Sequence, residues 1–576
     1  MKKLLYFTIL YCICSMIFAF RLKTDSNRNA SATKRYQTLR KQYSVSCRTG
    51  WSPDMADTEI GALKGWGDYR WKITTASDSV QFYFDQGINM YYAYHIVESI
   101  ASFRKAIRLD STCAMAWYGK ALAVGYSIDL AENGPVPAEA IEAAKKSMQY
   151  AGVCTPLEKS LIAAQAVRFT GDSTGGIVGM MQRYEHAMSV VAKDNAGNAD
   201  ALTLYADALT RKYLNLLYEK DLTPKPWTND IMKNLMAAIA IAPRHPGAHH
   251  MLVHTLQGSS HPQDAMHSAE ILPSLMPGMA HMVHMPSHIY LRTGFYQKGI
   301  TINDEAIAAF GNTAKEFSPV AGSSLFYSSH PTHVKAACAI MSGDYSVADA
   351  AAVVLRKELT PELLVIPGPF GTYMQYGYQT KVLSDVRFGK WEELLKEETV
   401  DTLAYAAVLS HFGKGIANAR LHKLNDADSE LRALEVCIHA PELKEATNEI
   451  DAFYEPATIA RDILKGVIAT ERKQYKQAIA AFERASITDD SLSYGEPRYW
   501  LLPARHYLGD VYLQMKNYKK AIEVFNQDLE LNPGNIWAFN GLLAAYTATS
   551  NTKDITTTKE KMKKADLHAA IGKPVY

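Results

Sequence analysis

The sequence predicts an all-α protein built from a tandem array of helix pairs. From about Val80 onward the apolar residues recur with a helical period, and no strand-like alternation of useful length interrupts them. The helical pattern itself repeats, since Trp117 begins a new unit 34 residues after Tyr83. The 576 residues exceed what one hydrophobic core usually covers, and an array of repeats accounts for that length.

Small and aromatic residues occupy the same positions in separate 34-residue units. They are Gly87, Ser99, Phe103 and Ala106 at positions 8, 20, 24 and 27; Gly466, Ala478, Phe482 and Ala485 at the same positions; and Gly509, Ala521 and Phe525 at positions 8, 20 and 24. We expect the small residues to let paired helices approach, and the aromatic to fill the gap to the next unit. This period is typical of tetratricopeptide repeats (TPR), so the predicted fold is a TPR-type α-solenoid, a right-handed superhelix of antiparallel helix pairs.

Changes of composition along the chain predict its organisation. Polar clusters without a sustained period fill the residues that follow the N-terminal apolar stretch, and Pro367-Gly368-Pro369 indicates a longer loop among the later helices. The predicted segments are a signal peptide at 1–19, a linker or loosely ordered extension at 20–79, N-terminal and central repeats at 80–350, further helical repeats with a long loop near 364–373 at 351–455, C-terminal TPR units at 456–550, and a C-terminal helix or tail at 551–576.

The first twenty residues have the layout of a secretory signal. Lys2 and Lys3 precede an apolar stretch that ends before Ala19. We therefore expect an exported protein, periplasmic or extracellular. Because cleavage after Ala19 would place Ile17 at the third position back, an uncleaved anchor is the alternative, and membrane attachment is expected only in that case.

Charge and cysteine spacing exclude several classes of protein. The 61 basic and 59 acidic residues nearly cancel, so nothing favours nucleic acid as a partner. The cysteines beyond the N-terminal stretch are widely spaced and odd in number, which fits neither a disulfide framework nor a CxxC metal site. No GxxxxGK[ST] or HExxH motif is present.

Histidines are concentrated in the middle of the chain. The 44 residues from His245 to His288 contain nine of the 18 histidines, where proportion would give roughly 1.4. The pairs His250/His254 and His284/His288 are 34 residues apart, so they follow the repeat. In the 34-residue frame seven histidines occupy positions 2, 5 and 9 of the first helix of three consecutive units: His250, His254, His281, His284, His288, His330 and His333. Spacing of i, i+4 stacks two imidazoles on one helix face.

These seven histidines are predicted metal ligands. First helices of adjacent units lie roughly 8 to 10 Å apart, so their imidazoles can converge on one ion. The set has neither cysteine nor carboxylate, which favours copper first and zinc second and disfavours calcium or magnesium. Seven imidazoles exceed the needs of one ion, so two ions with about three histidines each are an option beside a single ion. Paired three-histidine sites resemble, in ligand type alone, the dicopper centres of oxygen-binding and phenol-oxidising proteins; a single zinc would instead activate water for hydrolysis.

Other histidines have simpler predicted roles. His95 and His506 are expected to be satisfied polar residues within the helical array, and His411 a structural residue in preference to a distant ligand. His249, His261 and His267 fall outside positions 2, 5 and 9, so we expect them in turns or at the surface.

Two segments carry a resemblance to a known family. His245-Pro-Gly-Ala-His-His-Met-Leu-Val-His254 and His281-Met-Val-His-Met-Pro-Ser-His-Ile-Tyr290 resemble the HPGxxHxxxH and HxxHMPSHIY motifs of a family of exported bacterial TPR proteins without an assigned activity. The resemblance extends over about Val80 to Tyr546. It implies that the first helices line the concave surface of the solenoid, with positions 2, 5 and 9 facing the groove.

Two functions are consistent with these observations, and metal storage or delivery is a third that shares the ligands of the first. The first is an exported metalloprotein, in one form a metal-dependent oxidoreductase, whose ligands are the seven histidines. The second is an interaction scaffold whose concave groove binds a peptide or protein partner without metal, with histidines as adaptable hydrogen-bonding groups. Substrate and reaction are not encoded in any motif of the chain.

Overall fold

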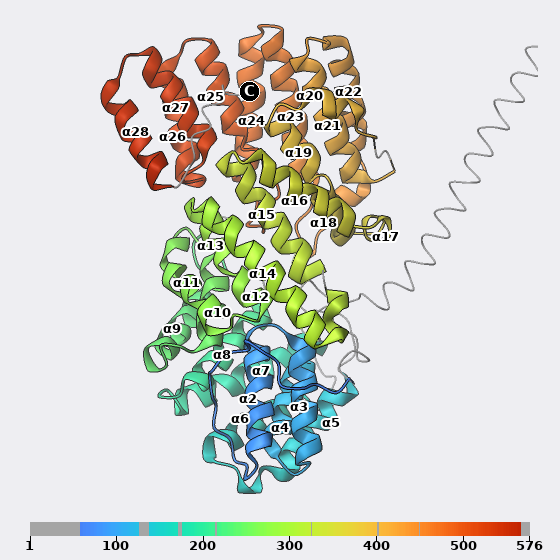
Figure 1. Cartoon of the computed structure of the whole chain (residues 1–576), viewed down its shortest axis with the longest axis vertical. Helices are drawn as coiled ribbons and strands as arrows, with labels where there is room; N and C mark the ends of the chain where they lie inside the picture. The colour runs from blue at the N-terminus through green and yellow to red at the C-terminus, as the bar shows by residue number, and fades with distance from the viewer. Residues whose placement is uncertain are drawn as a thin grey trace, which may run out of the picture.

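The computed structural model describes residues 58–125, 137–170, 176–213, 216–219, 221–323, 325–399, 402–447 and 450–565. Within these ranges the chain forms helices stacked into a solenoid, which runs from the blue N-terminal helices to the red C-terminal helices in Figure 1. The same ranges contain no strand; Tyr218 and Pro224 form an isolated β-bridge. The predicted all-α, TPR-type solenoid is confirmed.

Helices α2 to α14 form the N-terminal and central part of the array. Their bounds are α2 (Asp78–Tyr92), α3 (Ile96–Leu109), α4 (Ala114–Val124), α5 (Ala138–Tyr150), η3 (Ala151–Val153), α6 (Pro156–Arg168), α7 (Gly176–Asp194), α8 (Ala199–Tyr213), α9 (Pro226–Ile241), α10 (Pro246–Leu256), η4 (Pro262–Ala265), α11 (Met266–Leu275), α12 (Ala280–His284), α13 (Pro286–Thr293) and α14 (Tyr296–Glu316).

Helices α15 to α28 complete the array. Their bounds are η5 (Ser318–Ser323), η6 (Leu325–Ser329), α15 (His330–Ser342), α16 (Tyr345–Glu358), α17 (Pro361–Leu364), α18 (Pro369–Tyr378), α19 (Thr380–Arg387), α20 (Trp391–Lys396), α21 (Ala404–Arg420), α22 (Leu424–Cys437), η7 (Pro441–Lys444), α23 (Tyr454–Glu471), α24 (Tyr475–Asp490), α25 (Ala504–Gln514), α26 (Tyr518–Leu531), α27 (Ile536–Ala548) and α28 (Thr552–Lys564).

The aromatic residue at position 24 packs as its spacing predicts. A Cβ atom on Gly87 or on Gly119 would overlap the ring of Phe103, which is fully buried. Gly87 belongs to the same unit as Phe103 and Gly119 to the next one, so the ring lies between two units. Phe525 contacts Gly509 and Gly541 in the same way. Glycine at these positions lets the helices approach closely enough to enclose each ring.

Residues 58–77 differ from the predicted loose extension. They contain no helix, yet Trp66 and Trp71 are buried and Ile60 is 1% exposed. Backbone N–H groups of this segment donate to Gln86, Asp85 and Glu158 side chains of the solenoid, as with Trp71 N to Asp85 Oδ1 at 3.0 Å. The expectation was wrong here because a few large apolar side chains anchor a segment whose remaining composition is polar. Residues 1–57, with the predicted signal peptide, lie outside the described residues.

The long loop predicted near 364–373 is also shorter than expected. Helix α18 begins at Pro369, so residues 365–368 alone connect it to α17. Proline is well suited to the first helical position, where its missing N–H has no partner to lose. The Pro-Gly-Pro run therefore starts a helix.

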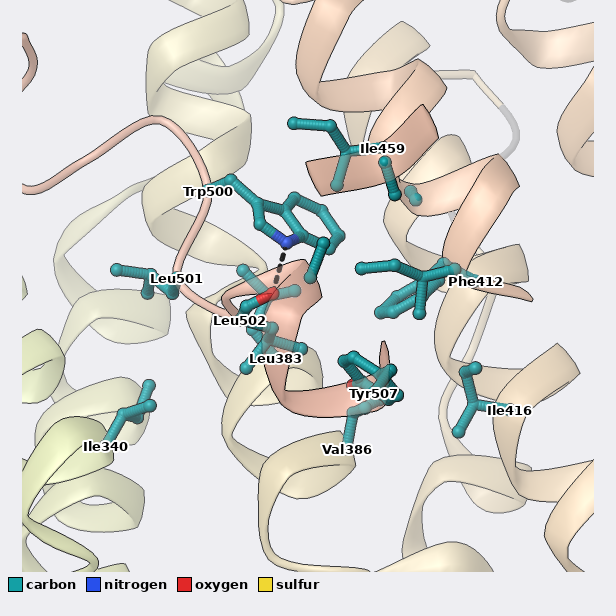
Figure 2. Close-up of a cluster of buried hydrophobic side chains, with 14 of the residues drawn as sticks. Ile340, Leu383, Val386, Phe412, Ile416, Ile459, Trp500, Leu501, Leu502 and Tyr507 are labelled. Atoms are coloured by element: carbon teal, nitrogen blue, oxygen red, sulfur yellow. Dashed lines mark hydrogen bonds between the residues drawn. The ribbon is translucent and has the colours of Figure 1, made fainter. Parts of the chain in front are cut away.

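A loop between α24 and α25, residues 491–503, is important for the site described below. Its Trp500 is 1% exposed and its indole Nε1 donates to the carbonyl oxygen of Leu502 at 2.6 Å. Figure 2 shows Trp500 within the C-terminal core, whose labelled members include Leu383, Val386, Phe412, Ile416 and Ile459. The C-terminal end of this loop is thereby fixed to the repeats.

Candidate metal centre

All seven predicted ligands lie on first helices of their units. His250 and His254 are on α10, His281 and His284 on α12, and His288 on α13. Helix α12 ends and α13 begins around Pro286, which lacks the N–H for a helical hydrogen bond, while Met285 keeps helical dihedral angles of −51° and −37°. The pair α12 and α13 therefore acts as one first helix. His330 and His333 are at the start of α15.

The structure brings six of the seven histidines into two groups. The first consists of His250, His254 and His281, and the second of His284, His288 and His330. Within each group, one ring nitrogen from each residue lies within 4.8 Å of the others. We call them the first and second three-histidine groups. Each combines positions 5 and 9 of one unit with position 2 of the next, so each is formed only when two units pack together.

Ring distances define the compactness of the groups. In the first group, the His250 ring centroid lies 4.7 Å from that of His254 and 4.9 Å from that of His281. His254 Nε2 and His281 Nε2 are 3.3 Å apart. These separations bring ring nitrogens from adjacent units close enough to share one ion.

The second group has similar dimensions. The His284 ring centroid lies 4.5 Å from that of His288 and 4.8 Å from that of His330. The two groups are neighbours, since the ring centroids of His281 and His284 are 6.3 Å apart.

His333 belongs to neither group. It occupies position 5 of the third unit, where position 9 is Ala337 and supplies no ligand. Its ring packs instead against Tyr376 at 4.9 Å, and burial lowers the pKa of His333 to about 3. The structure therefore separates it from the six histidines that converge.

The six histidines of the two groups, which together we call the histidine row, are largely buried. His250, His284 and His288 are at most 1% exposed, while His254, His281 and His330 are partly exposed. Tyr94, in the turn after α2, places its ring 4.5 Å from His250 and 5.5 Å from His281. Residues distant in sequence therefore lie against the buried histidines, Tyr94 beside His250 and Glu496 beside His288.

Polar contacts fix the tautomers of three of the six histidines. His284 Nδ1 donates to Asn303 Oδ1 at 2.5 Å, and the amide of Asn303 is itself oriented by donating to Gly299 O at 2.7 Å. His250 Nδ1 donates to the carbonyl oxygen of Tyr92 at 2.6 Å. In both residues the lone pair is then on Nε2.

His288 has the opposite tautomer. Its Nε2 lies 3.2 Å from Glu496 Oε2, and because a carboxylate accepts, Nε2 carries the proton and Nδ1 the lone pair. Nδ1 of His288 and Nε2 of His284 are buried and have no hydrogen-bond partner. Burying a polar atom without a partner costs free energy, so these two ring nitrogens are suited to binding a metal ion.

Electrostatics favour the neutral form that binds metal. Burial lowers the pKa of His284 to about 4, and it lowers the pKa of His281, His288 and His330 well below the ordinary value. Neighbouring histidines contribute further to the last three because like charges repel. Neutral imidazoles at pH 7 are ready to donate their lone pairs.

Sequence reasoning missed four residues around the groups: Tyr92, Tyr94, Asn303 and Glu496. Asn303 lies on the second helix of the unit that carries His284, and Glu496 is about 200 residues from His288. No motif links them to the histidines. His249 was also placed wrongly: it is buried in α10, with Nδ1 2.9 Å from Ser268 Oγ and Nε2 2.9 Å from Pro243 O. His261 and His267 are exposed, as expected.

Three of the other histidines contact carboxylates. His95 Nδ1 lies 2.8 Å from Glu98 Oε1, and His506 Nε2 lies 2.8 Å from Asp528 Oδ2; all four side chains are buried. His411 Nδ1 lies 2.7 Å from Glu430 Oε2. These contacts agree with structural roles for the three histidines.

Comparison with known proteins supports the repeat assignment. Residues 457–533 match the tetratricopeptide repeat family. Similar solved structures include a human IFIT1 dimer with m7Gppp-AAAA, at 14% identity over 88% of this chain and 92% of that chain with a TM-score of 0.28. Yeast Tom70 is similar at 11% identity over 84% and 92% of the two chains with a TM-score of 0.25. These scores are too low to carry an argument about function. No curated protein matches the chain in sequence.

Proposed function

We propose that this TPR-type solenoid protein binds two transition-metal ions, one in each three-histidine group. The observation that supports the proposal most is the convergence of ring nitrogens within 4.8 Å in both groups. Three neutral imidazoles are a complete protein ligand set for copper or zinc, and they leave a position for a further ligand. Copper is the first choice and zinc the second.

The chemistry depends on which metal binds. Copper would supply electron transfer, and the short separation between the groups supports a metal-dependent oxidoreductase in which two ions serve one substrate. Zinc would polarise water instead. The chain's own residues contribute fixed tautomers, through Tyr92, Asn303 and Glu496, and a cover over the first group, through Tyr94.

Elemental analysis of the untagged protein tests the proposal. After reconstitution with copper or zinc and removal of loosely bound ions, the wild-type chain should hold two ions. His254→Ala should hold one, His288→Ala should hold one, and the double variant none, because each substitution removes a ligand of one group. A wild-type protein that holds neither metal would refute the proposal.

His422→Ala provides a matched control for these variants. The side chain of His422 is exposed and lies 3.3 Å from Glu471, on a turn remote in sequence from both groups. The control should keep two ions. If it loses metal to the same extent as His288→Ala, the loss measures general histidine content instead of the two groups.

The second candidate is a protein-interaction scaffold, which the repeat match at 457–533 favours. Such a partner would be a peptide or protein that binds along the repeats. Burial of His250, His284 and His288 gives an extended peptide little access to the histidine row. Partner binding that survives chelation and is unchanged in His254→Ala/His288→Ala would support this candidate in place of the first.

Export is part of the proposal and rests on the N-terminal sequence pattern and on the resemblance of the histidine motifs. None of the helices in the described ranges is both long and apolar enough to cross a membrane. Cys113, Cys154 and Cys338 form no disulfide in the structure. Fractionation of cells that produce the full chain, with mass determination of its N-terminus, tests both export and cleavage.

A further inference from the structure

We propose that Glu496 is a positioning residue for His288 and makes the second three-histidine group the tighter of two unequal metal sites. This inference rests on the proposed metal binding and adds to it a difference between the ions. It also assigns a role to the loop between α24 and α25, which no ligand motif includes. The juxtaposition that carries it is the 3.2 Å contact between Glu496 Oε2 and His288 Nε2.

The contact places a carboxylate beside one ring nitrogen of a candidate metal ligand. Glu496 Oε2 lies 3.2 Å from Nε2, while Nδ1 of His288 is buried and has no hydrogen-bond partner. A carboxylate in this position fixes the tautomer and the ring orientation of a ligating histidine and increases its basicity. Glu496 itself lies on the outer side of the ring, so it supports the ligand and does not replace it.

The outer partners of the two groups differ in charge. In the first group, His250 donates to a neutral backbone carbonyl, that of Tyr92, and His254 Nδ1 lies 3.3 Å from the amide Nε2 of Gln257. In the second group, His284 donates to the neutral amide of Asn303, whereas Nε2 of His288 lies 3.2 Å from the carboxylate of Glu496. Charge-assisted hydrogen bonds are roughly twice as strong as neutral ones, so the second group gains the more basic ligand.

The loop holds Glu496 in place from the side of the C-terminal repeats. Tyr373 Oη donates to the carbonyl oxygen of Glu496 at 2.8 Å, and Tyr376 Oη donates to that of Arg498. Arg498 in turn donates to Asn532 Oδ1 at 2.9 Å and forms an ion pair with Asp489 at 3.0 Å. Trp500 fixes the following residues in the core shown in Figure 2.

Tyr494 anchors the other side of Glu496 to the histidine-bearing units. Its hydroxyl donates a hydrogen bond to the Glu496 side chain. The Tyr494 ring packs on Gly258, just beyond the end of α10, and lies under the guanidinium of Arg292 at 5.6 Å. Arg292 extends from α13, the helix that carries His288. Glu496 is thus clamped between both parts of the solenoid, which gives the contact to His288 a defined geometry.

Copper titrations of variants that each keep one complete three-histidine group measure the two sites separately. His254→Ala leaves the second group complete, and His330→Ala leaves the first group complete. Glu496→Gln is introduced into each, because glutamine keeps the shape of the side chain but removes its charge. Binding of Cu²⁺ is measured against a chelating competitor at one pH, with protein that carries no histidine tag.

We expect Glu496→Gln to change the Kd for Cu²⁺ in the His254→Ala background only. With His254→Ala, Glu496→Gln should raise the Kd for Cu²⁺ about 10- to 100-fold, the usual effect of losing such an outer partner. With His330→Ala, the Kd should be unchanged. Glu483→Gln, at an exposed position of α24, removes the same charge without contact to a histidine and should have no effect in either background.

Specific outcomes would overturn the inference. An unchanged Kd in the His254→Ala background, or an equal rise in both backgrounds, would show that Glu496 does not act on His288. A wild-type chain that binds no metal would refute the proposed function as well. Two ions bound by the wild type with no effect of Glu496→Gln would refute this inference alone.

Discussion

The second three-histidine group should bind metal almost equally well at pH 7 and pH 5, and this sets it apart from ordinary histidine sites. Protons compete with a metal for imidazole nitrogen only when the pH approaches the pKa of the metal-free ligand. Burial holds the pKa of His284 at about 4 and keeps that of His288 and His330 well below the ordinary value. Lowering the pH to 5 should therefore leave all three available.

The expected contrast is large. Three imidazoles with an ordinary pKa of about 6.5 would each lose a factor of about 33 at pH 5, which weakens apparent affinity roughly 3 × 10⁴-fold. A histidine whose pKa is about 4 loses a factor of only about 1.1 at the same pH. Burial also lowers the pKa of His288 and His330 well below the ordinary value, so the loss for the whole group should stay far below that of three ordinary imidazoles.

Zinc titration of His254→Ala, which keeps only the second group, measures this effect at pH 7 and pH 5 with a competitor of known protonation. A hexahistidine peptide in the same buffers is the control and should lose most of its affinity. Circular dichroism at both pH values verifies that the chain stays folded. A loss of affinity of more than about 100-fold by the folded protein would refute the reasoning, because at least two of the three ligands would then have to titrate with an ordinary pKa.

Stability of the metal-free protein, unlike metal binding by the second three-histidine group, should decrease as the pH falls. The folded pKa of His284 lies below its unfolded value, so the associated stability is fully present above pH 6.5 and is lost as the pH falls toward 4. At pH 5 the loss is about 2 kcal/mol for this residue. Thermal unfolding in the presence of a chelator should show a lower Tm at pH 5 than at pH 8, and added zinc should restore much of it. A Tm independent of pH would contradict the buried, neutral state of the row.

Three further predictions follow from single positions. His333→Ala should keep both ions, because His333 lies outside both groups, and elemental analysis that finds one ion would show a ligand role. Asn303→Leu should weaken the second site about 10- to 100-fold by releasing Nδ1 of His284, with the first site as internal control in the same copper titration. Gly119→Ala should destabilise the chain by about 1–3 kcal/mol, because its Cβ would overlap Phe103. Gly311→Ala, in a helix with open space around it, should stabilise by about 0.5–1 kcal/mol; equal effects on Tm would refute the packing argument.

The repeat architecture was readable because it is local and recurs. The glycine and phenylalanine positions were predicted from spacing, and the contacts of Phe103 and Phe525 with two glycines each agree with that prediction. The placement of all seven histidines on first helices was predicted in the same way. The errors fell where composition misleads: residues 58–77 are polar on average but anchored by tryptophans, and the Pro-Gly-Pro run begins a helix.

By itself, the sequence determined the solenoid, its register, and the stripe of histidines at positions 2, 5 and 9. Only the tertiary structure decided that six of these histidines form two groups, each of which joins positions 5 and 9 of one unit to position 2 of the next. His333 stays outside both groups, and position 9 of its own unit is Ala337, which supplies no ligand. It also decided that Tyr94 and Glu496 cover and support the row. Periodicity reports which face of a helix a residue occupies, whereas the meeting of separate units and of a distant loop depends on packing that leaves no local pattern in the chain.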